Sequence, residues 1–240
     1  MTHSVVIGGT HGIGRAVVRT FAAEGHQVTA MGRSPPPDGD RGQDRVSYRA
    51  IDVCDPEAVA VVFASLPAVD NVVFLQRYRG TADGWDAEHE TTLTATRRII
   101  EHLAARQSPP RSFVLMSSVA SVCVAHNQPA SYHVAKAGVN QLVRYFAVAL
   151  GARGIRVNGV APATTLKEES QDFFLGNAAL RELYAKMIPL GRMGTSQDVA
   201  DVTSFLCSEK AAFVTGQIIV VDGGLTLHCP ESLARQAVGW

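Results

Sequence analysis

The first 24 residues combine an apolar strand, a glycine-rich turn and an amphipathic helix, which constrains the fold more than any other stretch. Residues 3–7 predict a short buried strand, and apolar side chains recur with helical periodicity over residues 13–24. Glycines between them let the backbone approach a pyrophosphate closely, and the helix N-terminus offers it free N–H groups. The segment predicts a parallel α/β sheet with a nucleotide site formed by Gly8, Thr10, His11, Gly12, Ile13 and Gly14.

Further strands alternate with helices along the whole chain. Apolar segments predict strands at residues 27–31, 46–51, 71–75, 111–116, 155–160 and 217–221, and one long helix is expected at residues 85–105. This alternation is typical of a doubly wound, Rossmann-type parallel sheet of about seven strands with helices on both faces. We expect a single domain over residues 1–240, with a substrate-loop insert at about 163–190 and a C-terminal tail at 225–240.

The composition argues against several classes of protein. Lys and Arg together number 22, as do Asp and Glu, so the net charge of zero argues against a nucleic-acid-binding surface. The four cysteines form no Cys-x-x-Cys pair, which argues against a disulfide scaffold or a metal site. The chain lacks a signal-peptide pattern and an apolar run long enough to cross a bilayer, so we expect a cytoplasmic protein that does not bind membranes.

The second predicted strand ends at Gly32-Arg33-Ser34, where the ribose of a bound dinucleotide is expected. An acidic residue there would accept hydrogen bonds from the ribose hydroxyls of NAD, and none is present. Arg33 can instead bind the 2′-phosphate of NADP, with His11 adding a contact, and the alternative is that Arg33 is a solvated loop residue. We therefore expect NADP as the cofactor in preference to NAD.

Polar residues also follow the third and fifth predicted strands, at the edge of the sheet where ligands bind in open α/β folds. Asp52 can hydrogen-bond an adenine amino group, but Asp52 or Asp55 can instead cap the helix that begins near Pro56. Ser118 can hold a substrate carbonyl oxygen, although a lone serine in a loop turn is commoner. Each position is thus a candidate for ligand binding with a structural alternative.

Tyr132 and Lys136 lie four residues apart at the start of an apolar-periodic segment that extends to about Leu150 and predicts a helix. In a helix they project from the same face, so the phenol lies next to an ammonium. A neighbouring cation favours the phenolate and makes a tyrosine a better acid–base catalyst near neutral pH. The pair is a candidate catalytic site, and the alternative is a Tyr and a Lys that share a helix by chance.

Together these motifs resemble those of the classical short-chain dehydrogenases/reductases over nearly the whole chain. The matching residues are Gly8, Gly12, Gly14, Asp52, Val53, Ser118, Tyr132, Lys136, Asn158 and Pro162, followed by Pro189-Leu190-Gly191-Arg192, Thr215-Gly216-Gln217 and Asp222-Gly223-Gly224. The resemblance implies an NADP(H)-dependent oxidoreductase that interconverts a ketone and a secondary alcohol. It also implies a homo-oligomer, a tetramer or a dimer, that acts on a small-molecule carbonyl or alcohol substrate.

The resemblance further implies a mechanism. Hydride passes between the nicotinamide and the carbonyl carbon, while Tyr132 donates or accepts the proton. Lys136 assists Tyr132 and holds the ribose hydroxyls, and Ser118 stabilises the developing oxyanion. The further cofactor contacts that it implies are Gln76, Tyr132, Lys136, Pro162, Thr164 and Thr165.

Several positions depart from the family's pattern. Phe74-Leu75-Gln76-Arg77 replaces Asn-Asn-Ala-Gly after the fourth strand, and Thr92 stands where an Asn of a proton relay is common. Ser118 is one residue farther from Tyr132 than usual, which leaves Ser117 and Ser121 as alternatives. These differences concern proton transfer and leave the predicted fold intact.

Further hypotheses concern the substrate. We expect Arg77 or Arg79 to contact an anionic substrate group or the cofactor pyrophosphate, and the alternative is a solvated basic loop. Residues 164–188, with one helix at 178–187, are expected to form a lid with an apolar lining. The tail offers apolar side chains that can cover a patch near a neighbouring active site, namely Leu233, Ala237 and Trp240.

Two other functions fit the same residues. The altered strand-four motif and the absent relay Asn favour a nucleotide-binding sensor or scaffold without redox activity, whereas intact Ser118, Tyr132 and Lys136 favour catalysis. An isomerase or dehydratase that retains its cofactor is a third possibility. Consumption of NADPH with a panel of ketones, compared between the wild-type chain and a Tyr132→Phe variant, distinguishes the oxidoreductase from the sensor or scaffold.

Overall fold

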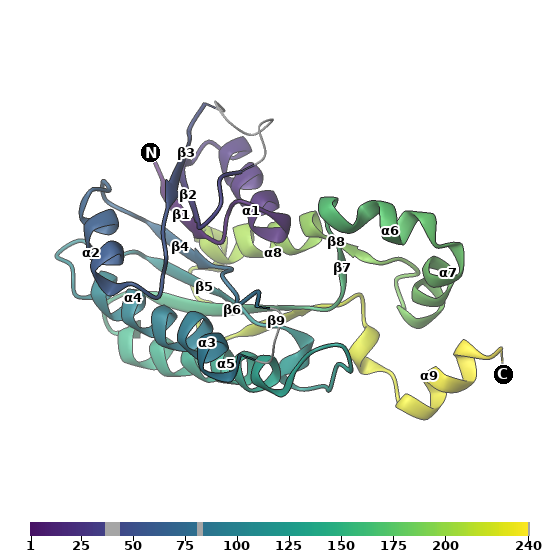
Figure 1. Ribbon diagram of the computed structural model, residues 1–240. Helices are drawn as coiled ribbons and strands as arrows, with labels where there is room; N and C mark the ends of the chain where they lie inside the picture. The colour runs from purple at the N-terminus through teal and green to yellow at the C-terminus, as the bar shows by residue number, and fades with distance from the viewer. Residues whose placement is uncertain (37–43, 81–83, 240) are drawn as a thin grey trace.

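A computed structural model describes residues 1–36, 44–80 and 84–239, and seven strands form its central sheet (Figure 1). These strands are β1 (His3–Ile7), β2 (Gln27–Gly32), β3 (Val46–Ala50), β4 (Asn71–Phe74), β5 (Ser112–Met116), β6 (Arg156–Pro162) and β9 (Ile218–Val221). Their order is β3-β2-β1-β4-β5-β6-β9, and every neighbouring pair is parallel. The predicted doubly wound parallel sheet is therefore confirmed.

The strand order changes direction beside β1. This strand pairs with β2 on one side and with β4 on the other, so the chain builds the sheet outward from β1 in both directions. Ligands of such sheets bind outside the carboxyl ends of the strands at this switch point. The segments that follow β1 and β4 are therefore expected to form the centre of a ligand site.

Helices cover both faces of the sheet (Figure 1). One face carries α1 (Gly12–Ala23) and α8 (Ser196–Cys207), and the other carries α2 (Pro56–Ala64), α4 (Ala95–Ala104) and α5 (Ala130–Gly151). Completely buried side chains fill the space between helices and sheet, including Phe21 and Leu206 on the first face and Phe63, Ile99 and Phe113 on the second. Each stabilises the fold by about 1.5–3 kcal/mol. Among the described helices, none is both long and apolar enough to cross a bilayer.

The single helix predicted over residues 85–105 is interrupted. A short helix, α3 (Trp85–His89), leads through a π-helical turn, η2 (Glu90–Thr94), into α4. Hydrophobic periodicity in the sequence does not reveal this arrangement, because the π-helical turn is only five residues long and lies between two helical segments. Such turns are frequent at functional sites. This one carries Thr92, and α3 packs against α5, the helix of Tyr132 and Lys136.

The segment between β6 and α8 projects from the end of the sheet and contains more helix than predicted (Figure 1). It consists of β7 (Thr165–Leu166), η4 (Glu168–Ser170), α6 (Gln171–Gly176), α7 (Ala178–Met187) and β8 (Gly194–Thr195), and β7 pairs with β8 at its base. The six residues of α6 are too few to show a helical period in the sequence. Helix α9 (Pro230–Ala237) packs against α7, while Trp240 lies outside the described residues and the side chain of Ala237 is not described.

Candidate active site

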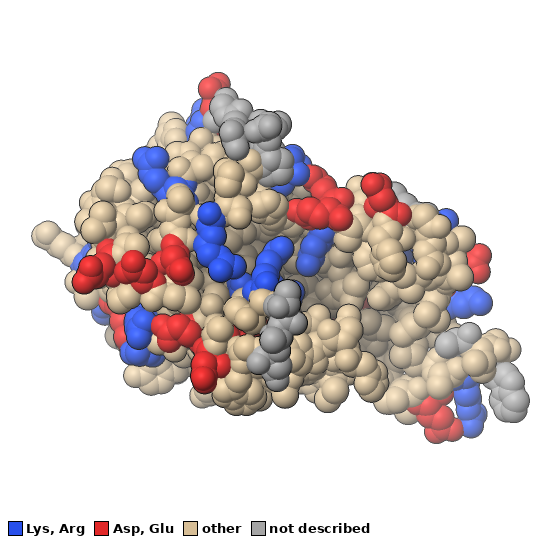
Figure 2. Space-filling model, viewed as in Figure 1, with Lys and Arg blue, Asp and Glu red and all other residues tan. Residues whose placement is uncertain are grey.

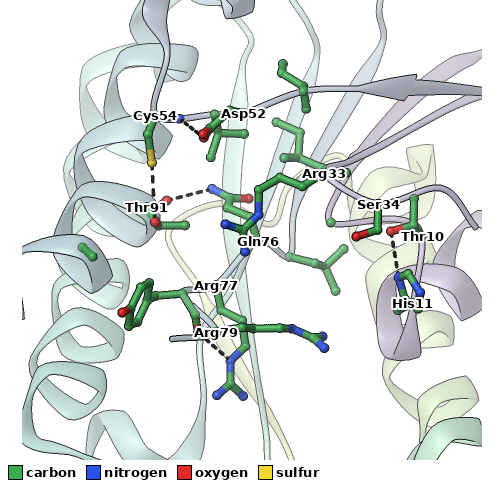
Figure 3. A pocket seen from close by; sticks show the side chains of 18 of the residues that line it. Thr10, His11, Arg33, Ser34, Asp52, Cys54, Gln76, Arg77, Arg79 and Thr91 are labelled. Atoms are coloured by element: carbon green, nitrogen blue, oxygen red, sulfur yellow. Dashed lines mark hydrogen bonds between the residues drawn. The ribbon is translucent and has the colours of Figure 1, made fainter. Parts of the chain in front are cut away.

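Two adjoining cavities lie at the carboxyl ends of the strands. Their volumes are about 580 and 360 Å³. The residues that line both of them are Gly8, His11, Leu75, Arg77 and Arg79. Figure 3 shows the larger cavity, with Arg33 directed into it and the amide of Gln76 turned toward Thr91 on its wall. Two compartments that share one wall suit a ligand whose two halves are joined by a linker.

The glycine turn after β1 leaves no room for side chains at two positions. A Cβ atom on Gly14 would lie 2.0 Å from the carbonyl oxygen of Gly8, and one on Gly8 would lie 2.7 Å from the carbonyl carbon of Leu75. Gly8 also has a φ of 80°, a backbone conformation in which glycine is favoured. These close approaches bring β1, the start of α1 and the end of β4 together at the shared wall of the cavities.

A carboxylate from a distant segment lies at the N-terminus of α1. Glu169 of η4 accepts a hydrogen bond of 2.8 Å from the backbone N–H of Gly12. Burial opposes ionisation of this carboxyl, but hydrogen bonds from its own N–H and that of Gly12 outweigh the effect and lower its pKa. The helix dipole also favours a negative charge at this end. The anion site at the start of α1 is therefore used by a side chain of the chain itself.

Arg33 follows β2 and lies exposed on the wall of the larger cavity (Figure 3). Close by, Nδ1 of His11 and Oγ1 of Thr10 are 2.9 Å apart and share a hydrogen bond. All three side chains belong to loops that follow neighbouring parallel strands, β1 and β2. This corner of the cavity therefore combines a guanidinium with an imidazole, both of which can contact an anionic group.

Asp55 rather than Asp52 caps α2. The carboxylate of Asp55 accepts hydrogen bonds from the N–H groups of Glu57 at 2.9 Å and Ala58 at 3.1 Å. Asp52 accepts a local hydrogen bond from the N–H of Cys54 at 3.0 Å and lines the larger cavity. Because it does not cap the helix, Asp52 is the aspartate that can contact a ligand.

Three serines follow β5, and their hydroxyl groups have different partners. Ser117 is buried and donates to Oδ1 of Asn140 at 2.6 Å, while Ser121 donates to the carbonyl oxygen of Ser118 at 2.7 Å. Ser118 lines the smaller cavity and accepts a hydrogen bond from the N–H of Ala120 at 3.1 Å. Among these three serines, Ser118 is the one whose hydroxyl proton has no described acceptor. Its hydroxyl can therefore donate to a ligand in the cavity.

Two cations lie close to the ring of Tyr132. The ammonium nitrogen of Lys136 is 5.5 Å from the ring centroid, and the guanidinium carbon of Arg77 is 5.3 Å from it. The helical spacing places Lys136 there, whereas Arg77 comes from the segment after β4. All three side chains line the smaller cavity together with Ser118. The phenol thus lies in a positively charged part of the cavity.

Lys136 is buried, and its ammonium donates a hydrogen bond of 2.8 Å to the carbonyl oxygen of Met116. Burial lowers the pKa of Lys136 to about 8, since the charged form is poorly solvated. The carboxylate of Glu88 opposes this shift, whereas Arg77 adds to it. Burial therefore has the largest effect on the charge of Lys136 near neutral pH, and one nearby anion and one nearby cation modify it.

The two residues that replace the family's relay and strand-four motifs have specific partners. Thr92 is buried and donates a hydrogen bond of 2.6 Å to Oε1 of Glu88. Gln76 donates to Oγ1 of Thr96 at 2.8 Å, while its own Oε1 is buried and accepts no hydrogen bond from the described residues. Gln76, Thr92 and Thr96 line a small cavity of about 10 Å³, roughly the size needed for one water molecule.

Basic side chains gather where the two cavities meet. Arg77 and Arg79 line both cavities and Lys167 lines the smaller one. Figure 2 shows Lys and Arg side chains grouped in the hollow at the centre of this face. Burial, together with the charges of Arg77 and Arg79, lowers the pKa of Lys167, while Glu169 opposes the shift. Such a concentration of positive charge favours an anionic ligand.

Every residue predicted to bind the cofactor or to act in catalysis lines one of these cavities. The larger is lined by Gly8, Thr10, His11, Arg33, Asp52, Val53 and Gln76, and the smaller by Gly8, His11, Gly12, Ile13, Gly14, Ser118, Tyr132, Lys136, Pro162, Thr164 and Thr165. The sequence analysis missed Cys54, Thr91 and Lys167 on these walls. None of the three belongs to a recognisable motif, so the sequence contains no signal for them.

Comparisons with known proteins identify the family of the chain. A family model described as enoyl-(acyl carrier protein) reductase matches residues 8–226. The 3beta-hydroxysteroid dehydrogenase 1 of Eggerthella lenta is 32% identical over 251 aligned residues, which cover 93% of each chain. The cis-4-hydroxycyclohexanecarboxylate dehydrogenase of Sinomonas cyclohexanicum is 33% identical, and that alignment covers 93% of this chain and 96% of the relative.

A solved structure with bound NADP has the same fold. It is an Agrobacterium tumefaciens protein described as a 2-deoxy-D-gluconate 3-dehydrogenase, and it superposes with a TM-score of 0.80 at 29% identity. The match covers 95% of this chain and 97% of that one. Because the family model and relatives of at least 30% identity both extend over most of the sequence, the chain belongs to the short-chain dehydrogenase/reductase family of oxidoreductases.

Proposed function

We propose that the protein is an NADP(H)-dependent oxidoreductase that interconverts a ketone and a secondary alcohol, with Ser118, Tyr132 and Lys136 as its catalytic residues. The observation that carries this proposal is their convergence on one cavity that adjoins the glycine turn. A ligand carbonyl beside Tyr132 would lie within the same compartment as the donor hydroxyl of Ser118. Lys136 and Arg77 surround the phenol with positive charge.

The side chains of the chain itself would control the proton and the developing charge. Tyr132 donates its proton to the carbonyl oxygen during reduction and takes it back during oxidation. Ser118 donates a hydrogen bond to the same oxygen and stabilises its negative charge. Lys136 favours the phenolate that remains after the proton has left. The cofactor, when bound, supplies the hydride.

Two features support NADP rather than NAD. Arg33 lies at the end of β2 without an acidic residue beside it, and guanidinium groups bind phosphate oxygens in a bidentate manner. The similar Agrobacterium tumefaciens structure contains NADP. The glycine turn, Asp52, Val53 and Gln76 would contact the rest of the adenosine half, and Pro162, Thr164 and Thr165 the nicotinamide half.

The basic cluster of Arg77, Arg79 and Lys167 extends the proposal to a second anionic group. Its place on the shared wall of the two cavities suits a pyrophosphate that joins the halves of a dinucleotide. A carboxylate on the substrate is the alternative, and the name of the Sinomonas cyclohexanicum relative includes a carboxylate substrate. The two assignments predict different effects of arginine substitutions on cofactor and substrate binding.

We further propose a single domain in which α6, α7 and α9 form a substrate lid. Phe174 lies on the wall of the smaller cavity, and α9 packs on α7, so the tail can support the lid. A homo-oligomer, a tetramer or a dimer, is supported by apolar side chains that α5 leaves exposed, including Val134 and Val148. Sedimentation of the wild-type chain and of a Val148→Glu variant tests the subunit surface.

A binding protein without redox activity is the second candidate. It is favoured by Thr92, whose hydroxyl bonds Glu88 in place of a relay Asn. The deciding experiment follows NADPH absorbance with a panel of ketones in the wild-type chain and in Tyr132→Phe. Turnover by the wild-type chain alone supports the oxidoreductase. Binding of NADPH without turnover of any ketone by either protein would support the sensor or scaffold.

A further inference from the structure

Glu88 and Lys136 form a buried pair of opposite charges. Among the residues described, Glu88 is the only buried carboxylate and Lys136 the only buried ammonium or guanidinium, with exposed fractions of 3% and 4%. They belong to α3 and α5, which pack together and lie side by side in Figure 1. A buried charge without a partner destabilises a protein by several kcal/mol. Burial of these two residues in neighbouring helices therefore requires a physical explanation.

The two charges act on each other without a direct hydrogen bond. The ammonium of Lys136 donates to the carbonyl oxygen of Met116 at 2.8 Å, and Oε1 of Glu88 accepts from Thr92 at 2.6 Å. Two described charged residues influence Lys136, namely Glu88 from α3, which favours its charged form, and Arg77 from the segment after β4, which opposes it. Tyr132 is the titratable group that faces Lys136 from its own helix. Of these two charges, Glu88 is therefore the one that stabilises the protonated form of Lys136.

We propose that Glu88 is a positioning residue, the counter-ion that keeps Lys136 protonated next to Tyr132. This inference rests on the proposed proton transfer by Tyr132. Thr92 lies in the π-helical turn four residues after Glu88, and its hydrogen bond fixes one carboxylate oxygen. Thr92, which stands where the family resemblance predicts a relay Asn, therefore orients a buried carboxylate. Without Glu88, burial and Arg77 would drive the proton from Lys136 at a lower pH.

The test measures the protonation of Lys136 directly. The chain contains four lysines, Lys136, Lys167, Lys186 and Lys210, so a carbon-13 label at the lysine ε position gives few resonances. The resonance that is missing from a Lys136→Arg variant belongs to Lys136. In Glu88→Gln, which keeps the shape and the acceptor oxygen for Thr92, we expect the titration midpoint of Lys136 to fall by about one pH unit, a tenfold change in its acid constant.

Matched variants distinguish the effect of the lost charge at position 88 from an effect of altered structure. Glu88→Asp retains the carboxylate and should titrate close to the wild-type chain, which also provides a readout should the Gln variant fail to fold. Glu101→Gln removes an exposed carboxylate from α4, where it pairs with Arg97, and should leave the titration of Lys136 unchanged. An unaltered midpoint in Glu88→Gln, or an equal shift in Glu88→Gln and Glu88→Asp, would overturn the assignment.

Kinetics test the link to catalysis. For ketone reduction by Glu88→Gln, the alkaline limb of kcat/KM should move to lower pH by about one unit, since Lys136 loses at a lower pH the positive charge that stabilises the phenolate left when Tyr132 donates its proton. A shifted resonance with an unchanged pH profile would overturn the role of Glu88 in proton transfer. Absence of ketone reduction by the wild-type chain would contradict the proposed function, while the resonance titration would still decide whether Glu88 is the counter-ion.

Discussion

The carboxylate of Glu169 and the backbone N–H of Gly12 form a hydrogen bond of 2.8 Å at the N-terminus of α1. The neighbouring Glu168 forms ion pairs with Arg15 and Arg19 of the same helix. Two consecutive acidic residues of the lid segment therefore hold it against α1. Because a pyrophosphate bound at the start of α1 needs the same N–H groups, cofactor binding and the position of η4 are expected to be coupled.

Removal of the carboxylate of Glu169 should strengthen cofactor binding. In Glu169→Ala the N–H of Gly12 loses its internal acceptor, and we expect the Kd for NADPH to fall about threefold to tenfold, the effect of one competing hydrogen bond. Isothermal titration calorimetry provides the measurement. Glu182→Ala, which removes an exposed carboxylate from α7, is the matched control and should bind NADPH like the wild-type chain. Weaker binding by Glu169→Ala would show that the carboxylate assists the cofactor instead of competing with it.

Tyr132→Phe should abolish turnover while NADPH binding remains. The substitution removes the proton donor but keeps the ring that lies close to Lys136 and Arg77, so kcat should fall by about 10²–10⁴-fold, the usual contribution of a positioned general acid. Steady-state kinetics and NADPH titration measure the two properties. Tyr145→Phe, at an exposed position of the same helix, should retain full activity. Equal activity of wild-type chain and Tyr132→Phe would exclude Tyr132 as the acid.

Arg33→Ala should change the preference between the two dinucleotides. A charge-assisted pair with the 2′-phosphate contributes about 1.5–3 kcal/mol, so the Kd for NADPH should rise about tenfold to a hundredfold. The Kd for NADH, which lacks this phosphate, should change little and acts as the internal control. Equal losses for both dinucleotides would mean that Arg33 does not recognise the phosphate.

The Arg77→Ala/Arg79→Ala variant tests the basic cluster. If these arginines bind the pyrophosphate, the Kd for NADPH should rise at least about tenfold, and kcat/KM should fall equally for acidic and neutral ketones. Measurements on an oxo acid and its uncharged amide compare the two substrate classes. A loss confined to the acid, with unchanged NADPH affinity, would instead assign the arginines to the substrate.

The stability of the protein should depend on pH through Lys136. Burial lowers the pKa of Lys136 from 10.5 to about 8 in the folded chain, so between these values the unfolded chain binds more protons and stability rises with pH. The gain should reach at most about 3 kcal/mol. Urea denaturation of wild-type and Lys136→Met chains at a series of pH values should show a steeper rise in the wild-type chain, because Lys167, whose pKa is also lowered, is present in both. Parallel curves over that range would contradict the assigned shift.

Features that depend on residues close together in the sequence were predictable. Alternating apolar segments predict the parallel strands, because burial on both faces requires them. The glycines between β1 and α1 follow from close backbone contacts within a single turn, as Gly8 and Gly14 illustrate. Tyr132 and Lys136 converge because helical spacing alone brings residues four apart to one face. Each of these inferences depends on local geometry that any chain with this pattern shares.

Other features required the folded chain. Three interactions join elements that lie far apart in the sequence. They are the hydrogen bond between Glu169 and Gly12, the contact of Arg77 with the ring of Tyr132, and the electrostatic interaction of Glu88 with Lys136. The choice of Ser118 among three serines depends on where Asn140 lies in α5. Periodicity and motif spacing specify which face a side chain occupies, but the packing of one element on another decides which partner it meets. Only the tertiary structure could therefore show which charged residues interact in this site, because electrostatic interactions depend on distance in space and on burial.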